Sequence, residues 1–310
     1  MRSREETLRA IRDRFPNSSG MVSLSSMTTW RTGGPAVVAT ADSLEELARL
    51  LEFTWTENIP WFVLGQGSNV LAADEGCLEL IIRLEGALTR ASWKLEDGSW
   101  RLSCGAGTRL PSMSGAACTR GAAGLEFAVG IPGTVGGGVF MNAGAYGSSI
   151  SRFLVQVTAL DSSGSTRIIA LEDCDFGYRR SRFQSESWIV AGAEFELPFG
   201  DPCRLRAEAS RILELRRRKF PLEHPNAGSV FRKPAEDVPP GRLIEEAGLK
   251  GTAIGGAEVS GKHANFIVNR GGATSADIRA LMDLVRERVL ESSGILLEEE
   301  IVCIGRFQGS

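Results

Sequence analysis

Two glycine-rich stretches decide the fold: GQGSNVL at residues 65–71 and GIPGTVGGGVFMNAGAYG at residues 130–147. The first follows the apolar run WFVL at residues 61–64 and leads into further apolar residues. Glycine permits positive φ and lets the backbone approach a ligand closely, and consecutive backbone N–H groups in such loops cradle phosphates. The pattern predicts two loops that hold a pyrophosphate, although tight turns between strands would use glycine as well.

Glycine is unusually frequent in the chain, with 36 residues among 310, against roughly 7% in an average protein. The first stretch is nevertheless not the fingerprint of a Rossmann domain, because that motif needs a third glycine and an immediate helix. Here Asp74, Glu75 and Gly76 follow, and then a strand-like run at residues 78–84. The sequence therefore predicts no separate Rossmann domain.

The overall composition is that of an ordinary globular protein, with 43% hydrophobic and 24% charged residues and a net charge of −3. The basic residues are scattered, so no nucleic-acid partner is expected. Residues 1–15 form a charged amphipathic stretch that does not resemble a signal peptide. The longest uncharged run, residues 127–150, is interrupted by Pro132 and several glycines, so we expect a buried, loop-rich segment and no membrane partner.

Metal and disulfide chemistry are not expected either. His224 and His263 are the two histidines of the chain, and its six cysteines include no CxxC pair, so no zinc site is predicted. Widely spaced cysteines in a chain that can bury a large core indicate free thiols in a reducing compartment. We therefore expect a cytoplasmic protein.

The hydrophobic pattern predicts an α+β protein. Strands are expected at residues 61–64, 78–84, 154–160, 166–171 and 188–197, and a pair of strands at 91–104 around a Glu-Asp-Gly turn at 96–98. Helices are expected at residues 1–15, 43–55, 110–120, 203–219 and 241–248, and in a last segment after Thr274. The charge density rises from residue 203, which indicates that a second domain begins there.

Capping signals support two of these helices. Ser43 with Glu46, and Thr274 with Asp277, have the spacing of capping boxes. Gly294 is placed to end the last helix. Residues at helical spacing assign one face of that helix to the core: Ile278, Leu281, Val285 and Val289.

Six collinear motifs are far more specific than a single glycine loop. Besides the two glycine stretches they are YRRSRF at 178–183, AGSVF at 227–231, LIEEAGLKG at 243–251 with IGGAEVSGKHANFIVN at 254–269, and LEEEIVCIG at 297–305. In order and spacing, from near Thr28 to Gly305, they resemble the family of UDP-N-acetylenolpyruvoylglucosamine reductase, a flavoenzyme of bacterial cell-wall precursor synthesis. The direct path from Phe183 to Gly228 resembles the shorter subclass, which lacks an extra tyrosine-bearing loop over the substrate.

This resemblance implies a noncovalent FAD in an N-terminal domain of the vanillyl-alcohol-oxidase type, with a C-terminal α+β substrate domain. It places the FAD-binding region at residues 1–200, with subdomains near 1–66 and 67–200, the substrate domain at 201–298, and a C-terminal strand that returns to the active site at 299–310. The implied reaction reduces the UDP-sugar UDP-N-acetylglucosamine enolpyruvate to UDP-N-acetylmuramate. NADPH is the implied co-substrate, and it would alternate with the enolpyruvyl substrate at one face of the flavin. No oligomeric state follows from the sequence.

Reducing an enolpyruvyl ether needs a hydride donor, a group that stabilises the negative charge developing toward the carboxylate, and a proton donor. The resemblance assigns the stabilising role to Arg179 and Glu300 and the proton to Ser229. It implies cofactor contacts in the two glycine stretches, at Gly65, Gly67, Ser68, Asn69, Gly130, Gly133, Thr134 and Gly137. Contacts with the uridine diphosphate are expected from Lys219, Lys262, His263 and Asn265, because cations and amides suit phosphates and uracil.

Some positions depart from the family pattern. WRTGG at residues 30–34 stands where the family has an aromatic residue followed by Arg, Ile, Gly and Gly, so Trp30 and Thr32 lie in an altered motif. Lys233 stands where the family more often has asparagine, and Ile301 replaces the usual valine. These changes concern the positioning of the substrate and not the reaction.

Two alternatives remain at the level of sequence. An FAD-dependent oxidase of the same fold would often tether its flavin through a histidine or cysteine, and neither histidine lies in a predicted FAD loop. A flavin-binding module without turnover would have no need for the three catalytic residue types that the motifs retain. Both alternatives are therefore less favoured than the reductase.

Overall fold

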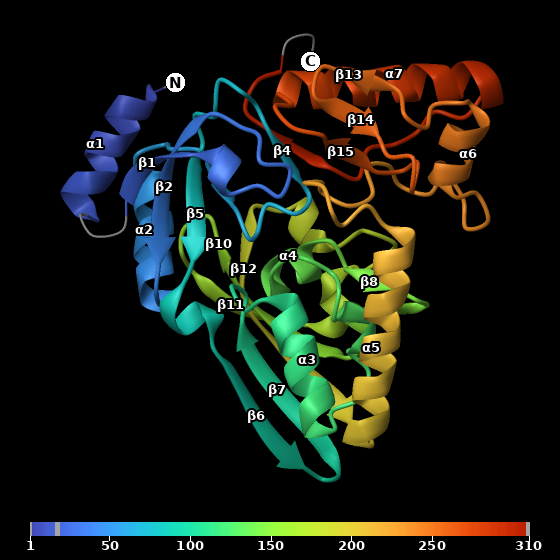
Figure 1. The fold of residues 1–310 in the computed structure, drawn as a ribbon. Coiled ribbons are helices and arrows are strands. Elements are labelled where there is room, and N and C mark those ends of the chain that lie inside the picture. The colour runs from blue at the N-terminus through green and yellow to red at the C-terminus, as the bar shows by residue number, and fades with distance from the viewer. Residues whose placement is uncertain (1, 16–18, 308–310) are drawn as a thin grey trace.

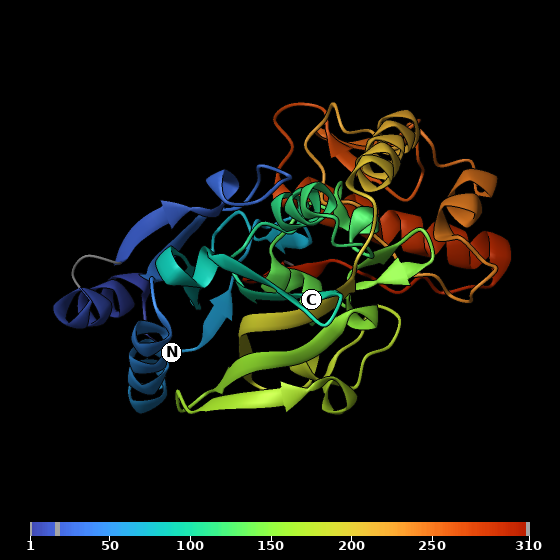
Figure 2. The ribbon, with the colours of Figure 1, turned by 90° about the horizontal axis from the view of Figure 1, so that it is seen from below.

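A four-stranded sheet and a five-stranded sheet form the first part of the molecule in the computed structural model, and a smaller unit with a long helix packs over one end of them (Figure 1). The structure describes residues 2–15 and 19–307. Viewed from below, the C-terminal unit lies beside the first sheet on the side away from helix α2 (Figure 2). Apart from the mixed four-stranded sheet and one parallel pair, the sheets are antiparallel.

The four-stranded sheet has the strand order β1-β2-β5-β3, with strands at Ser19–Ser23, Pro35–Ala41, Leu80–Leu84 and Trp61–Val63. Helices α1 (Arg4–Arg14) and α2 (Leu44–Thr56) pack against it. Ser43 caps α2 as predicted, since its hydroxyl accepts a hydrogen bond from the Glu46 N–H at 3.1 Å. The reciprocal hydrogen bond of the predicted capping box, from the Ser43 N–H to the Glu46 carboxylate, is not formed. The Glu46 carboxylate accepts from the Asp42 N–H at 2.9 Å instead, so this half of the prediction is wrong.

The five-stranded sheet is antiparallel, in the order β11-β10-β12-β7-β6. Its strands are Thr166–Ala170, Leu154–Asp161, Trp188–Pro198, Ser99–Gly105 and Ala91–Glu96. The predicted hairpin turn is present, because Asp97 and Gly98 both have positive φ, at 48° and 79°, as a two-residue hairpin loop requires. Helices α3 (Leu110–Arg120) and α5 (Pro202–Lys219) lie side by side next to this sheet (Figure 1).

The segment at residues 127–150 contains more regular structure than the sequence predicts. It holds the short helix α4 (Val135–Phe140) and a small hairpin of β8 (Gly144–Ala145) and β9 (Ser148–Ser149). The sequence pattern does not predict α4, because this helix contains three consecutive glycines and glycine is an unfavourable helix residue. The Thr134 hydroxyl caps it by accepting from the Gly137 N–H at 3.3 Å, so tertiary contacts and a cap outweigh the poor propensity.

The C-terminal unit is a three-stranded sheet packed against α7. It consists of α6 (Pro240–Glu246), β13 (Ala253–Ile254), β14 (Ala257–Val259), β15 (Ile267–Asn269) and α7 (Ser275–Ser293). The predicted capping box of Thr274 and Asp277 and the C-cap Gly294, with φ of 71°, are confirmed. The predicted apolar face of α7 is fully buried. Among the described residues, no helix is both long and apolar enough to cross a lipid bilayer.

The two parts of the molecule are joined through the first glycine stretch. Strand β16 (Val302–Ile304) runs back and pairs in parallel with β4 (Val70–Ala72), with Val302 opposite Val70. The Trp30 side chain is wholly buried in the C-terminal core, and its indole N–H donates to the Ile267 carbonyl at 2.8 Å. Strand β16 is therefore held directly beside residues 65–69.

Candidate active site

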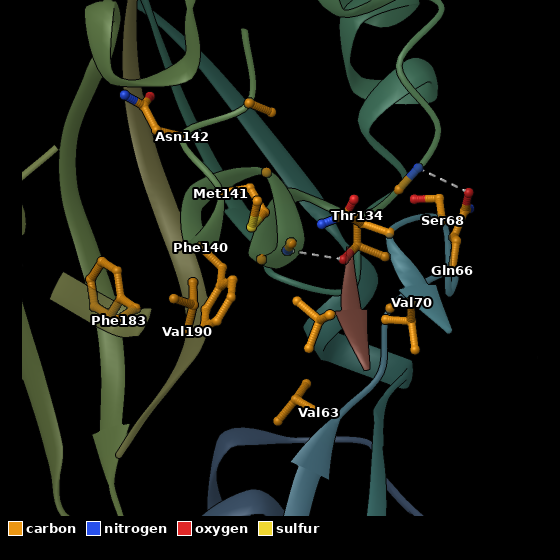
Figure 3. A pocket seen from close by; sticks show the side chains of 18 of the residues that line it. Val63, Gln66, Ser68, Val70, Thr134, Phe140, Met141, Asn142, Phe183 and Val190 are labelled. Atoms are coloured by element: carbon orange, nitrogen blue, oxygen red, sulfur yellow. Dashed lines mark hydrogen bonds between the residues drawn. The ribbon is translucent and has the colours of Figure 1, made fainter. Parts of the chain in front are cut away.

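A pocket of about 1490 Å³ lies where the two sheets meet the C-terminal unit. One wall carries the two glycine-rich loops, and another carries apolar side chains of α4 and β12 (Figure 3). Phe140 of α4 and Val190 of β12 are among these apolar residues, and Phe183, from the short turn Arg182–Gln184, lies with them. A concave, mostly apolar cavity with a few polar groups is the usual form of a cofactor site.

The first glycine loop presents unused hydrogen-bond donors to this pocket. Within the described chain, none of the five backbone N–H groups at residues 65–69 donates a hydrogen bond to the protein. Backbone N–H groups away from water rarely remain without a partner, and a row of them is suited to phosphate oxygens. This loop fits the pyrophosphate of FAD.

The two glycine loops form one cradle because side chains tie them together. The Ser68 hydroxyl donates to the Pro132 carbonyl at 2.9 Å. The Gly133 N–H donates to the Gln66 side chain at 3.2 Å (Figure 3). Gly67 has φ of 60°, and a Cβ atom there would lie 2.3 Å from the Met27 carbonyl oxygen. Only glycine permits this backbone path.

The second loop differs from the prediction that both stretches offer free N–H groups. The N–H groups of Val135 and Gly136 donate to the carbonyls of Thr108 and Ala106, each at 2.8 Å. The Gly137 N–H is used by the Thr134 hydroxyl, which caps α4. In this loop the backbone groups mostly support the fold, and the absence of side chains leaves room in the pocket.

Gly130 is the one predicted cofactor residue that does not line the pocket. A Cβ atom there would lie 2.3 Å from Cδ of Arg216 on α5. Glycine at this position thus permits close approach of α5. The other seven predicted cofactor residues line the pocket.

Arg179 and Glu300 meet at the end of the pocket nearest the C-terminal unit. The Arg179 Nε donates to the Glu300 carboxylate at 2.7 Å, and its Nη2 donates to the Gly144 carbonyl at 3.1 Å. Arg179 has φ of 53°, which is strained for a residue other than glycine. The Gln184 amide stabilises this backbone by donating to the Arg179 carbonyl at 3.0 Å.

The backbone of Glu300 is fixed from two sides. Its N–H donates to the Val230 carbonyl at 2.8 Å, and its carbonyl accepts from the Asn69 side-chain amide at 3.0 Å. The carboxylate is mostly buried, with 11% of the side chain exposed. Burial raises the pKa of Glu300 above its ordinary value, while the nearby guanidinium groups of Arg179 and Arg232 oppose this shift.

A second pocket, of about 580 Å³, adjoins the first on the side of the C-terminal unit. Arg179, Ser229 and Glu300 line both pockets. Ser229 lies between Gly228, whose φ is 80°, and Val230, whose backbone is bonded on both sides. The structure thus brings together three side chains that are far apart in the sequence, at the junction of two cavities.

The four predicted uridine diphosphate residues are divided between the pockets. Lys219, at the end of α5, is exposed and lines the large pocket. Lys262, His263 and Asn265 line the small one. The Lys262 ammonium already donates to the Arg217 carbonyl at 2.8 Å.

Asn265 is engaged with the protein. Its side-chain oxygen accepts from the Phe231 N–H at 3.0 Å, and its side-chain nitrogen donates to the Phe231 carbonyl at 2.9 Å. Its own carbonyl accepts from the Val230 N–H. The hydrogen bonds of Asn265 therefore hold the segment that carries Ser229. The sequence did not suggest this structural role for Asn265.

Comparison with known proteins identifies the family. A model of the C-terminal domain of UDP-N-acetylenolpyruvoylglucosamine reductase matches residues 220–304, and a model of an FAD binding domain matches residues 35–170. The UDP-N-acetylenolpyruvoylglucosamine reductase of Heliobacterium modesticaldum is 47% identical over 283 residues, which cover 91% of this chain and 89% of that protein. The chain belongs to the UDP-N-acetylenolpyruvoylglucosamine reductase family.

Further relatives agree with this assignment. The UDP-N-acetylenolpyruvoylglucosamine reductase of Synechococcus sp. strain RCC307 is 43% identical over 93% of this chain and 94% of that protein. The crystal structure of the UDP-N-acetylenolpyruvylglucosamine reductase of Thermus caldophilus matches with a TM-score of 0.79 at 34% identity, covering 92% of this chain and 98% of that one. The predicted α+β fold class, with an FAD-binding domain followed by the C-terminal domain of this family, is confirmed.

Membership of the reductase family also confirms the predicted enzyme class and cofactor. The chain is an FAD-dependent oxidoreductase of peptidoglycan precursor synthesis. The oxidase and the non-catalytic flavin module are not favoured by these matches. In the described part of the chain, no group of three or more histidine, cysteine or acidic side chains is placed to hold a metal ion.

The positions that depart from the reductase family pattern lie at the joint between the two parts of the molecule. Trp30 and Ile301 are buried in the C-terminal core, and Thr32 is buried close by, with a hydroxyl that has no hydrogen-bond partner in the described structure. Lys233 lines both pockets. Of these positions, Lys233 is the one placed to contact a substrate.

Several supporting residues of the reductase site carried no signal in the sequence. Gln66, Gln184 and Asn265 act on backbone groups that lie 67, 5 and 34 residues away along the chain. Glu299 likewise carried no signal, and two arginines of α7 bind its carboxylate. Such pairings depend on the folded topology and not on local pattern.

Proposed function

We propose that Arg179, Glu300 and Ser229 carry the reduction of the enolpyruvyl ether of UDP-N-acetylglucosamine enolpyruvate. The observation that carries the proposal is that these three residues line both the large and the small pocket in the described structure, where Tyr178 and Lys233 do so as well. FAD in the large pocket and the nucleotide-sugar in the small one would meet at these side chains. Bound FAD supplies the hydride chemistry, with electrons from NADPH.

Arg179 and Glu300 act on the negative charge that develops toward the substrate carboxylate when hydride is added to the alkene. The Arg179 guanidinium supplies a fixed cation, which needs no reorganisation because Gly144 and Glu300 already hold it. Burial raises the pKa of Glu300, and an anionic substrate beside it raises that pKa further. Glu300 lies beside the Arg179 guanidinium and is placed to act with it on the developing enolate.

Ser229 supplies the proton that completes the reduction at the second alkene carbon. A serine hydroxyl is a weak acid, so this role needs a fixed position and a strongly basic acceptor, which the enolate provides. Val230 and Asn265 fix the backbone next to Ser229. One hydride and one proton thus add across the double bond.

The small pocket fits the uridine diphosphate. It is lined by four cationic side chains besides Arg179, namely Lys233, Arg242, Lys250 and Lys262. His263 offers a ring nitrogen. Burial lowers the pKa of this histidine, and the positive charges of Lys250 and Lys219 lower it further. A neutral imidazole among cations suits uracil or ribose groups, while the cations suit the phosphates.

This assignment matches the proposed division of the chain into an FAD-binding region at 1–200, a substrate domain at 201–298 and a returning strand at 299–310. One hydrophobic cluster supports a separate C-terminal part, since it is built almost entirely from residues beyond 226. Helix α5 instead packs against α3 of the first part, which favours a boundary after α5 and not at residue 201. A cytoplasmic location is also proposed. It is supported by the six cysteines, all of which are free, as expected in a reducing compartment.

The test is a spectroscopic assay of the two half-reactions with the purified protein. It should be yellow, release FAD on denaturation, and lose its flavin absorbance under anaerobic NADPH. UDP-N-acetylglucosamine enolpyruvate should then restore the absorbance and gain two hydrogens, detectable by mass spectrometry. A bleached flavin that this substrate does not reoxidise would contradict the proposal.

A further inference from the structure

Glu299, the neighbour of the catalytic Glu300, is held by two arginines of α7. The Arg279 guanidinium donates both of its terminal N–H groups to the two carboxylate oxygens, at 2.8 and 2.6 Å. Arg286 donates a third hydrogen bond at 3.2 Å. The side chains are 15% exposed for Arg279 and 22% for Glu299. A bidentate, half-buried pair of this kind fixes orientation as well as charge.

The two arginines belong to one rigid face of α7. Positions 279, 283 and 286 are separated by four and three residues, so their side chains lie along one side of the helix. Asp283 joins this row through a hydrogen bond from Arg279 Nε at 3.0 Å. The helix itself is fixed, because the N–H groups of Ser275 and Ala276 donate to the Asp74 carboxylate at 2.8 and 2.9 Å.

The backbone on either side of Glu299 links its contact with α7 to the direction of the Glu300 side chain. The Arg232 N–H donates to the Glu298 carbonyl, and the Glu300 N–H donates to the Val230 carbonyl, both at 2.8 Å. The tail is therefore paired in an extended form with the segment that follows Ser229. In extended chain, successive side chains point to opposite sides. With Glu299 bound to α7, the next carboxylate must face the pocket.

We propose that Glu299 is a positioning residue that orients the Glu300 carboxylate toward Arg179 and the substrate. The proposal rests on the catalytic role proposed for Glu300. The bidentate contact with Arg279 adds to these backbone hydrogen bonds in fixing the rotation of the tail about its own axis. Glu299 touches neither pocket, so it acts through Glu300.

The experiment compares Glu299→Gln with Glu298→Gln and Glu300→Gln in the full-length holoprotein. Glu298 is the matched control, because it is the adjacent carboxylate of the same tail and its side chain is exposed. Stopped flow measures flavin reduction by NADPH and flavin reoxidation by the enolpyruvyl substrate separately. The pH profile of reoxidation is recorded for each variant, beside a thermal melt.

For Glu299→Gln we expect reoxidation to slow by about 10- to 100-fold, the order of loss that a small misplacement of a catalytic group causes. Reduction by NADPH should be unchanged, and the pH profile of reoxidation should move, because the contact between Glu300 and Arg179 is altered. Glu298→Gln should leave both half-reactions at the wild-type rate. A lowered melting temperature with normal reoxidation would mean a purely structural role and would overturn the proposal.

Two further results separate this proposal from the one on which it rests. If Glu300→Gln is itself fully active, the role of Glu300 fails and the positioning role fails with it. If Glu300→Gln is impaired while Glu299→Gln is not, only the positioning role is overturned. Should Glu299→Gln not fold, Arg279→Lys retains the charge and removes the bidentate geometry, and it must show the same selective loss of reoxidation.

Discussion

The two sides of the active site use different parts of the polypeptide. On the cofactor side, residues 65–69 offer backbone N–H groups, and their side chains mainly hold the loops together. On the proposed catalytic side, we assign the chemistry to three side chains, Arg179, Ser229 and Glu300, whose segments are held by backbone contacts. The cofactor side therefore depends on the path of the chain, and the catalytic side depends on functional groups.

This contrast makes the two sides separable by mutation. A change of backbone conformation should remove flavin and leave no reaction to measure. A change of functional group should leave a yellow protein that performs one half-reaction and not the other. The predictions below test this separation, beginning with the largest effect.

Ser229→Ala should give the largest effect. Flavin content and reduction by NADPH should be unchanged, since hydride transfer from the nicotinamide needs no proton from this hydroxyl. Reoxidation by the enolpyruvyl substrate should slow by about 10²- to 10⁴-fold, the usual loss for a positioned proton donor. Stopped-flow absorbance of the flavin measures both steps. Equal slowing of the two steps would show that Ser229 is not the donor.

Gly67→Ala should damage the cofactor side. The new Cβ would lie 2.3 Å from the Met27 carbonyl oxygen, at φ of 60°, and strain of this kind costs about 1–3 kcal/mol. We expect a lower melting temperature and a protein that is purified largely without flavin. Gly115→Ala is the control, because that helical glycine has no atom within 4 Å of a new Cβ. A Gly67→Ala protein that is purified with its full content of bound FAD would contradict the described loop geometry.

Gly137→Ala should separate cofactor binding from folding. A Cβ there meets only the Thr134 hydroxyl, at 3.7 Å, so the melting temperature of the apoprotein should stay close to that of the wild type. Gly137 lines the pocket, so we expect the added methyl group to lower FAD affinity by about tenfold, equivalent to roughly 1.4 kcal/mol. Titration of apoprotein with FAD, followed by fluorescence, measures this. Unchanged affinity would remove Gly137 from the cofactor contacts.

The smallest effect is expected from pH, through His263. Burial lowers its pKa from the ordinary 6.5, so the unfolded chain binds a proton more readily than the folded one. Protonation of His263 therefore does not reduce the free energy of unfolding above pH 6.5, and this free energy falls as the pH decreases below 6.5. The decrease in Tm should be small beside the effects of the variants above, because a single group is involved. His263→Gln should show a weaker acid-side decrease, and an identical pH profile would refute the role of His263.

Much of the fold could be predicted where local signals are strong. The last helix has a cap, an apolar face and a glycine stop, and its predicted residues agree with the structure. The hairpin at residues 91–105 follows from one Asp-Gly turn. By contrast, α4 contains three glycines, and β13 and β14 have only two or three residues each. These elements exist because of tertiary packing, which local propensity does not record.

The candidate site shows the same division. Motifs identified Arg179, Ser229 and Glu300, and the structure places them together. Motifs could not show that the amide of Asn265 is occupied by Phe231 or that the second glycine loop uses its own N–H groups. Both facts depend on which backbone groups meet in three dimensions. Glycine content alone therefore did not distinguish a ligand cradle from a packing device.

The parallel pairing of β16 with β4 also has a consequence for the order of folding. Glu300 meets Arg179 and Asn69 across 121 and 231 residues of chain, and closing such long loops costs more entropy than local contacts do. The cradle at residues 65–69 and its sheet can thus form before the last strand arrives. During refolding, flavin fluorescence should be quenched first and turnover should recover later. A molecule caught between these stages binds its cofactor and is inert.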